Sequence, residues 1–323
     1  MSTHEAAILS GKGERFTVQS IPTPQPGPHE LLVGVKAIAV NPIDWKQRDF
    51  GLAVASYPAI VGSVGVRIAA LANSFYVQGR PAYDGFQAKV VVPVSNAVVI
   101  PDSLSHIDAA TLPVCVATSW AAWFSLGLPN TTTAQFQPSD AKALLVWSAA
   151  SSAGGGAVQA ARDLGFTVFA TASPQHHAYV QSLGAAEVFD YHSADIVEQI
   201  VTAARRRGVT VQTAFHANGA LRPVLDVVKT FGGGKVAETI PLTRATPQED
   251  GVDIRFINAP ADPDQRSTHF AFVFQEWLGP RLANGSFVPG PKTRVIPGGL
   301  GGLDAALDVL KQGVSGEKLV VEV

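Results

Sequence analysis

The chain has 323 residues, of which 46% are hydrophobic and 15% charged, and its formal net charge is −2. This length favours two domains with sizeable cores, and the near-neutral charge gives no reason to expect nucleic acid or an acidic membrane as a partner. The single cysteine, Cys115, excludes an intramolecular disulfide and a zinc site built from several cysteines. We find neither a signal-peptide pattern nor an apolar run of about 18 residues, so we expect a cytoplasmic protein.

Short strands separated by turns are predicted from residue 6 to residue 101. Thr17–Ile21 alternates between polar and apolar residues, as a half-buried strand does. Four of the seven residues in Pro22–Pro28 are prolines, which excludes a helix there. Three more strands are predicted at Leu31–Ala39, Phe86–Val92 and Asn96–Ile100. A helix follows over Pro113–Leu126.

From Lys142 the pattern changes to alternating strands and helices, which is typical of a parallel, doubly wound α/β sheet. The final segments are a helix at Ser267–Ala283, a strand at Thr293–Ile296, a helix at Leu303–Lys311 and a strand at Lys318–Val323, and we expect them to return to the first domain. We therefore predict a β-rich domain from residues 1–112 and 287–323, and a cofactor-binding domain from residues 113–286. The strands predicted in the second domain are Lys142–Trp147, Thr167–Ala172, Glu187–Asp190, Val209–His216 and Gly234–Ile240.

The turn after the first of these strands has the composition of a phosphate-binding loop. Ser148, Ser151 and Gly154 keep a spacing of small residues in which serines replace two glycines. Small residues let the backbone approach a pyrophosphate, and the helix that follows offers unpaired N–H groups and a positive dipole end. Ser151 and Ser152 add hydroxyls. The alternative is a small-residue turn that only packs a helix on a sheet, and the strand–turn–helix–strand context makes it the weaker interpretation.

The second strand lacks the acidic residue that normally follows it. An Asp or Glu at this end accepts hydrogen bonds from the ribose of NAD and repels the extra phosphate of NADP. Here the strand ends at Ser173, and no carboxylate occurs between Phe166 and Gly184. Ser173, His176 and Tyr191 are candidates to contact the 2′-phosphate of NADPH. The alternative for Ser173 is an N-cap for a helix that begins at Pro174.

Several motifs resemble a known family. Val40-Asn-Pro-Ile-Asp-Trp-Lys46 and Tyr57-Pro-Ala-Ile-Val-Gly-Ser63 resemble signatures of the zinc-free medium-chain dehydrogenases/reductases. More closely, the chain resembles fungal trans-acting enoyl reductases that work with polyketide synthases. The resemblance implies a Rossmann domain and a GroES-like domain. Other matching segments are Gly85–Ala88, Ala117–Trp120, Leu183–Ala186 and Val295–Gly299.

The resemblance also implies roles for single residues. Lys46 would contact the nicotinamide ribose and orient cofactor and substrate, and Asn41 and Asp44 would shape the same floor. Thr118 would lie beside the nicotinamide carboxamide, which makes Lys46 and Thr118 the candidate catalytic residues. A further cofactor contact is implied at Ile240, Pro241 and Leu242. The alternative for Lys46 is an ordinary surface lysine.

We expect no metal. Catalytic zinc in this superfamily needs cysteine and histidine ligands. Asp44 stands where the family has its first cysteine, and Ser63 departs from the Gly-His-Glu pattern that would follow Gly62. Cys115 lies far along the chain, on a predicted helix.

One departure from the family pattern concerns the first domain. Ile60–Ser63 runs directly into Val64–Ile68, so the GroES-like domain is expected to be shortened after Ser63. About twenty residues are missing, including a central strand, and such a gap would leave exposed strand edges.

These features predict an NADPH-dependent enoyl reductase that reduces α,β-unsaturated thioesters or carbonyl compounds in polyketide biosynthesis. The substrate would be a small molecule or an acyl group on a carrier, and the partner a polyketide synthase. One alternative is a quinone or small-enone oxidoreductase. Another is a non-catalytic NADPH-binding protein, which the shortened domain favours. The sequence leaves both a monomer and a homodimer open.

Overall fold

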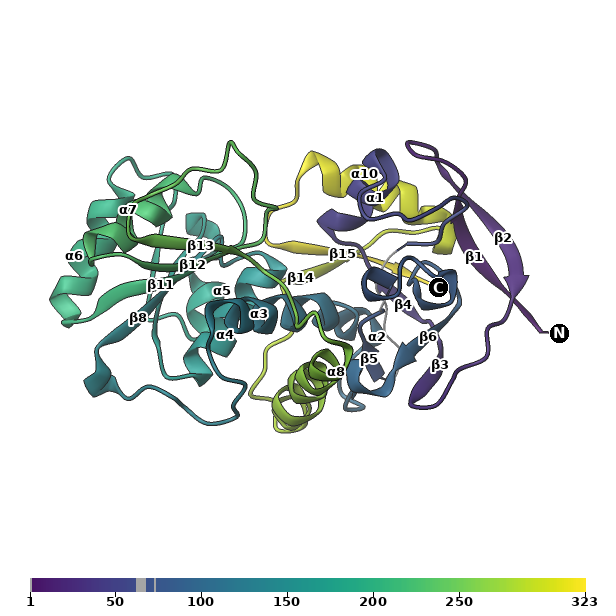
Figure 1. The fold of residues 1–323 in the computed structure, drawn as a ribbon, viewed down its shortest axis with the longest axis horizontal. Coiled ribbons are helices and arrows are strands. Elements are labelled where there is room, and N and C mark those ends of the chain that lie inside the picture. Colours follow the sequence, from purple (N-terminus) through teal and green to yellow (C-terminus); the bar gives the residue numbers. More distant parts are fainter. Residues whose placement is uncertain (1, 62–67, 73) are drawn as a thin grey trace. The chain divides into compact units, whose positions relative to one another are not determined.

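The computed structural model describes residues 2–61, 68–72 and 74–323 (Figure 1). It divides into two compact units: Met1–Val114 with Phe270–Val323 form unit 1, and Cys115–His269 form unit 2. The chain thus re-enters unit 1 at Phe270, whereas the predicted cofactor domain extends to residue 286.

Unit 2 is built on one sheet of six parallel strands. Its order is β10-β9-β8-β11-β12-β13, so the first strand in sequence, β8, is central and the chain proceeds outward on both sides of it. This is the doubly wound order of dinucleotide-binding domains. The strands are β8 (Lys142–Trp147), β9 (Thr167–Thr171), β10 (Glu187–Phe189), β11 (Thr210–His216), β12 (Gly234–Glu238) and β13 (Val252–Phe256). Five agree with the predicted strands, while β13 was not predicted.

Two helices of unit 2, α6 and α7, each present an apolar stripe to this sheet. Val224 and Val228 of α7 and Ile200 of α6 belong to one apolar core with Leu145 of β8. Trp123 of α3 meets Phe215 of β11 edge to face, with ring centroids 6.0 Å apart. The helices are α3 (Leu112–Leu126, which crosses the boundary of the units), α4 (Ser152–Asp163), α5 (His177–Ser182), α6 (Ile196–Arg207), α7 (Arg222–Thr230) and α8 (Pro263–Ala271).

Unit 1 is β-rich, and its described strands form small sheets. β15 pairs with β14 in parallel and with β4 in antiparallel orientation, so the end of the chain returns to the first unit, as predicted. The core gathers Ile38, Phe86, Leu303 and Leu319 among its buried side chains. The strands are β1 (Thr3–Leu9), β2 (Phe16–Pro22), β3 (Glu30–Gly34), β4 (Ala37–Ala39), β5 (Ile68–Ala70), β6 (Lys89–Pro93), β7 (Ala97–Val99), β14 (Lys292–Val295) and β15 (Glu317–Glu322); the helices are α1 (Pro42–Phe50), α2 (His106–Ala109), α9 (Gly279–Ala283) and α10 (Leu303–Gln312), with a π-helix at Phe272–Leu278.

The predicted shortening after Ser63 involves residues 63–67, which lie outside the described residues. Within the described part of the chain, one stretch, His106–Leu126, is long and apolar enough to cross a membrane by length and composition alone. Its most apolar window is 78% buried inside the fold, which is typical of a core helix.

Candidate active site

The turn between β8 and α4 is shaped by the side chains of its own serines. Ser148 has a left-handed backbone, with φ of 62°, and its hydroxyl donates to the carbonyl of Asn218 at 2.9 Å. Ser151 is the N-cap of α4: its hydroxyl accepts the N–H of Gly154 at 3.1 Å and donates to the carbonyl of Ser148 at 2.8 Å. Both hydroxyls are therefore engaged within the protein. The hydroxyl oxygen of Ser152 is buried and has no hydrogen-bond partner among the described residues.

Close packing keeps this turn small. A Cβ atom on Gly154 would lie 2.4 Å from the carbonyl oxygen of Ser148. A Cβ atom on Gly156 would lie 2.6 Å from the sulfur of Cys115, so α3 packs directly on the first turns of α4. A helix N-terminus leaves its first N–H groups without intrahelical partners. Together with the buried, unpaired hydroxyl of Ser152, this compact turn fits the pyrophosphate of a dinucleotide.

The ends of β9 and β10 bring two hydroxyls together. The side-chain oxygens of Ser173 and Tyr191 lie 2.9 Å apart. Ser173 occupies the N-cap position of the turn Pro174–His176, but its side chain makes no capping hydrogen bond. Asp190, the carboxylate next to Tyr191 in the sequence, accepts the N–H of His192. The end of β9 is thus lined by hydroxyls, and His176 is half-buried beside it in sequence.

In unit 1, two of the predicted site residues build the start of α1. The carboxylate of Asp44 accepts the N–H of Asn41 at 2.7 Å. The side chain of Asn41 donates to the carbonyl of Ala39 at 3.0 Å and accepts from the ammonium group of Lys318. Asn41, Asp44 and Lys318 are all buried. Burial raises the pKa of Asp44 to about 7, against the opposing effects of the Asn41 hydrogen bonds and the Lys318 charge.

Lys46 differs from its neighbours because its ammonium group has no hydrogen-bond or ion-pair partner among the described residues. Its ammonium nitrogen lies 5.7 Å from the centre of the Trp45 ring, and among the described residues it makes no hydrogen bond or ion pair. Lys311 lies 5.6 Å from the same ring but is paired with Asp49 at 2.6 Å. A half-buried lysine without an ion-pair partner is available to a ligand.

Thr118 lies on α3 in unit 2 and is half-buried. The next residue, Ser119, donates its hydroxyl to the carbonyl of Cys115 at 2.9 Å and lies 3.3 Å from the carbonyl of Ala153 at the start of α4. This contact ties the position of Thr118 to the turn between β8 and α4. The predicted segment Ile240–Leu242 is an exposed loop that follows β12.

Sequence reasoning missed three buried polar groups. Burial raises the pKa of Asp84 to about 8, the nearby charge of Asp44 raises it further, and a hydrogen bond from Ser74 opposes this. His216 and Glu238 form a buried pair at the ends of β11 and β12. A signal did exist for this pair, since each is a polar residue that ends an apolar strand.

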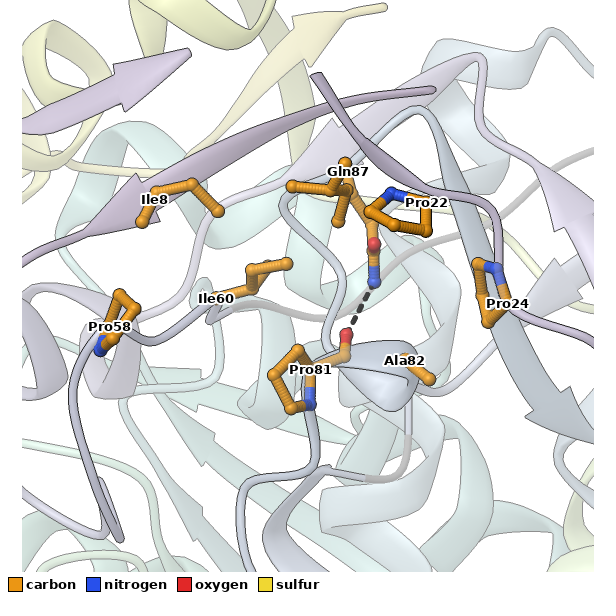
Figure 2. A pocket seen from close by; sticks show the side chains of 9 residues that line it. Ile8, Pro22, Pro24, Pro58, Ile60, Pro81, Ala82 and Gln87 are labelled. Carbon is orange, nitrogen blue, oxygen red and sulfur yellow. Dashed lines mark hydrogen bonds between the residues drawn. The ribbon is translucent and has the colours of Figure 1, made fainter. Parts of the chain in front are cut away.

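A second feature of unit 1 is an apolar pocket of about 320 Å³ (Figure 2). The amide nitrogen of Gln87 donates to the carbonyl of Pro81 at 2.7 Å, as Figure 2 shows, and to the carbonyl of Asp84 at 2.6 Å. Gln87 is thus already satisfied, and the pocket offers no charged side chain to a ligand. The lining residues are Ile8, Ile21, Pro22, Pro24, Pro58, Ile60, Pro81, Ala82 and Gln87.

Within the described residues, no group of three or more His, Cys, Asp or Glu side chains is placed to hold a metal ion. The strand order and the turn between β8 and α4 are those of a Rossmann-type domain, the cofactor-binding domain of dehydrogenases and reductases.

Comparison with known proteins narrows this class. A search against protein-family models found no match. The chain is 42% identical to the trans-enoyl reductase tndF of Aspergillus flavipes, covering 98% of both chains. It is 40% identical to the trans-enoyl reductase tazE of Aspergillus terreus, covering 78% of this chain and 91% of the relative. Among solved structures, CurK enoyl reductase aligns over 99% of both chains with a TM-score of 0.72 and 21% identity.

The chain belongs to the family of the trans-enoyl reductases and is an oxidoreductase, and it shares the fold of CurK enoyl reductase. The predicted family and the predicted Rossmann and GroES-like fold class are confirmed. The alignment with tndF runs over 341 positions, more than the 323 residues of this chain, so the relative has residues without a counterpart here.

Proposed function

We propose that this chain is an NADPH-dependent enoyl reductase that saturates the C=C bond of an α,β-unsaturated acyl thioester in polyketide biosynthesis. The observation that carries the proposal is the near full-length relation to proteins named trans-enoyl reductases. The natural substrate would be an acyl group bound to a carrier domain of a polyketide synthase in the cytoplasm. Unit 2 would be the cofactor-binding domain, within the predicted limits 113–286, and the β-rich unit would present the substrate.

The preference for NADPH over NADH rests on the end of β9. Ser173 and Tyr191 place two hydroxyls 2.9 Å apart where an NAD-specific domain has a carboxylate, and His176 would add positive charge. The backbone N–H groups at the start of α4 and the hydroxyl of Ser152 would bind the pyrophosphate. The hydroxyls of Ser148 and Ser151 would act indirectly, by fixing the shape of the turn.

The nicotinamide cofactor, when bound, supplies the hydride that adds to the β-carbon of the substrate. The residues of the chain orient the reactants and stabilise charge. Lys46 would contact the nicotinamide ribose, and Thr118 would fix the carboxamide. The carbonyl oxygen of the thioester gains negative charge as the hydride arrives, so preorganised N–H or hydroxyl donors lower the barrier. Solvent would deliver the proton to the α-carbon, which completes the saturated product.

A steady-state assay with a crotonyl thioester tests this function. We expect consumption of NADPH with formation of the butyryl thioester, and slower consumption of NADH. Faster reduction of a carrier-bound than of a free substrate would support a partner synthase. Reduction of free quinones without activity on thioesters would favour a quinone oxidoreductase. Tight NADPH binding without turnover on any acceptor would favour a non-catalytic protein, and neither binding nor turnover would refute the proposal.

A further inference from the structure

A buried polar pair ends two neighbouring strands at the carboxyl edge of the six-stranded sheet. His216 is the last residue of β11 and Glu238 the last of β12, and they lie opposite each other in the strand register. The imidazole Nδ1 and the carboxylate Oε2 are 2.7 Å apart, and the two residues are 0% and 2% exposed. A carboxylate removed from water in this way needs hydrogen bonds to both of its oxygens.

The second carboxylate oxygen serves the loop that follows β12. Oε1 of Glu238 accepts the N–H of Ile240 at 2.8 Å. Thr239 binds the end of β11 in addition, because its N–H donates to the carbonyl of His216 and its hydroxyl to the carbonyl of Ala217. Two adjacent strand ends therefore hold the first residues of this loop.

The loop itself is exposed. Ile240 and Leu242 have 42% and 40% of their surfaces accessible, although both are apolar. It lies at the carboxyl edge of the sheet, where domains with this strand order bind dinucleotides. The turn between β8 and α4 bonds to the same segment after β11, since the hydroxyl of Ser148 donates to the carbonyl of Asn218, two residues after His216. The backbone carbonyls of residues 216–218 therefore accept hydrogen bonds from both that turn and Thr239.

We propose that Glu238, oriented by His216, is a positioning residue that holds the Ile240–Leu242 loop in place for the nicotinamide half of the cofactor. The inference rests on the proposed function, because the loop can have this role only if the chain binds NADPH. Glu238 acts through the amide of Ile240 and does not itself touch the ligand, in keeping with its complete burial. His216 fixes the carboxylate so that Oε1 faces that amide.

Substitutions at this pair can distinguish a residue that positions the loop from one that only stabilises the fold. In Glu238→Gln, the amide oxygen can still accept the N–H of Ile240, and the amide nitrogen can donate to Nδ1 of the other imidazole tautomer. Glu238→Ala removes the acceptor. Ile240→Pro removes the N–H donor at an exposed position and keeps both side chains of the buried pair, so it tests the same hydrogen bond from the other side, and its melting temperature reports any cost to folding.

The control is Val236→Ala, two residues earlier on the same face of β12. Val236 is fully buried in the core of unit 2, so its truncation lowers the melting temperature without touching the loop. The experiment measures the Kd for NADPH by fluorescence titration, the KM for NADPH and kcat, and the melting temperature of each variant.

We expect Glu238→Ala and Ile240→Pro to raise the Kd and KM for NADPH about tenfold, the loss expected for one charge-assisted hydrogen bond. Glu238→Gln should stay within about threefold of wild type, and Val236→Ala should bind normally despite a lower melting temperature. Unchanged binding in Ile240→Pro would overturn the proposal, as would equal losses in the Ala and Gln variants. If the wild-type protein does not bind NADPH at all, the proposed function fails instead.

Discussion

The two regions assigned to the cofactor use their polar residues in opposite ways. At the carboxyl edge of the unit 2 sheet, Ser152 has an unpaired hydroxyl, and Ser173 and Tyr191 present a half-buried pair of hydroxyls. In the Asn41–Lys46 segment of unit 1, Asn41 and one carboxylate oxygen of Asp44 are buried and bonded within the fold. The other carboxylate oxygen of Asp44 is buried without a hydrogen-bond partner, and the half-exposed ammonium group of Lys46 makes no hydrogen bond or ion pair among the described residues.

This difference shows that one sequence motif contains both residues that shape the local backbone and residues whose polar groups are available to a ligand. Asn41 and Asp44 determine where α1 starts, and in doing so they set the position of Lys46 two residues later. In unit 2, Ser148 and Ser151 likewise shape the turn. Substitutions in the two regions should therefore divide into those that disturb local structure and those that affect only the ligand.

The largest effect is expected at Gly154. A methyl group there would meet the carbonyl of Ser148 at 2.4 Å, so the turn must move, and we expect Gly154→Ala to weaken NADPH binding about a hundredfold. Gly155→Ala is the matched control, because its methyl would meet only the ends of the Leu183 and Tyr179 side chains, at 3.2 and 3.4 Å. Isothermal titration with NADPH measures both. Similar affinities in the two variants would show that the turn does not hold the phosphates.

Lys46→Met tests whether the unpaired charge acts on the ligand. We expect kcat/KM to fall roughly 10- to 100-fold with little change in melting temperature, because no ion pair within the described part of the fold is lost. Lys311→Met removes a lysine over the same Trp45 ring, but one whose charge is paired with Asp49. That control should retain wild-type kinetics. Equal kinetic losses in the two variants would assign Lys46 a structural role.

Ser173→Asp tests the cofactor preference in unit 2. A carboxylate at this position should repel the 2′-phosphate, and we expect the Kd for NADPH to rise about tenfold while that for NADH stays equal or falls. Ser182→Asp adds the same charge at an exposed position at the end of α5 and serves as the control. An unchanged ratio of the two dissociation constants would place the 2′-phosphate elsewhere.

The smallest effect on ligand binding is expected at the buried carboxyl of Asp84 in unit 1, which acts on stability. Its pKa in the folded protein, about 8, lies above the ordinary value of 3.8, because burial disfavours the charged form. The folded state therefore binds the proton more tightly, and this stabilisation is complete below the unfolded pKa and is lost as the pH rises toward 8.

Replacing Asp84 with Asn removes this titration. We expect the free energy of unfolding of Asp84→Asn, relative to wild type, to be more favourable by roughly 3–4 kcal/mol at about pH 8 than at about pH 5. Urea denaturation at the two pH values measures the difference. A gain that does not depend on pH would mean that Asp84 is not protonated in the folded protein.

Much of this architecture was predictable because its signals are local. Alternating strands and helices predicted the parallel sheet, and the small residues around Ser148–Gly154 predicted the turn. The absence of a carboxylate after β9 can be read directly from the sequence. The edge strand β13 (Val252–Phe256) was missed although its residues alternate as in a half-buried strand, because no helix separates it from β12 and the search relied on alternating strands and helices.

Tertiary structure decided which polar residues are available to a ligand. The pairing of His216 with Glu238 joins residues from two strands, and the bond from Lys318 to Asn41 joins opposite ends of the chain. Burial, and with it the raised pKa values of Asp44 and Asp84, depends on the packing around a residue. Spacing along a chain sets the type of each local element. Only the folded chain determines which atoms lose water, and that loss decides whether a polar group stabilises the fold or remains free to bind.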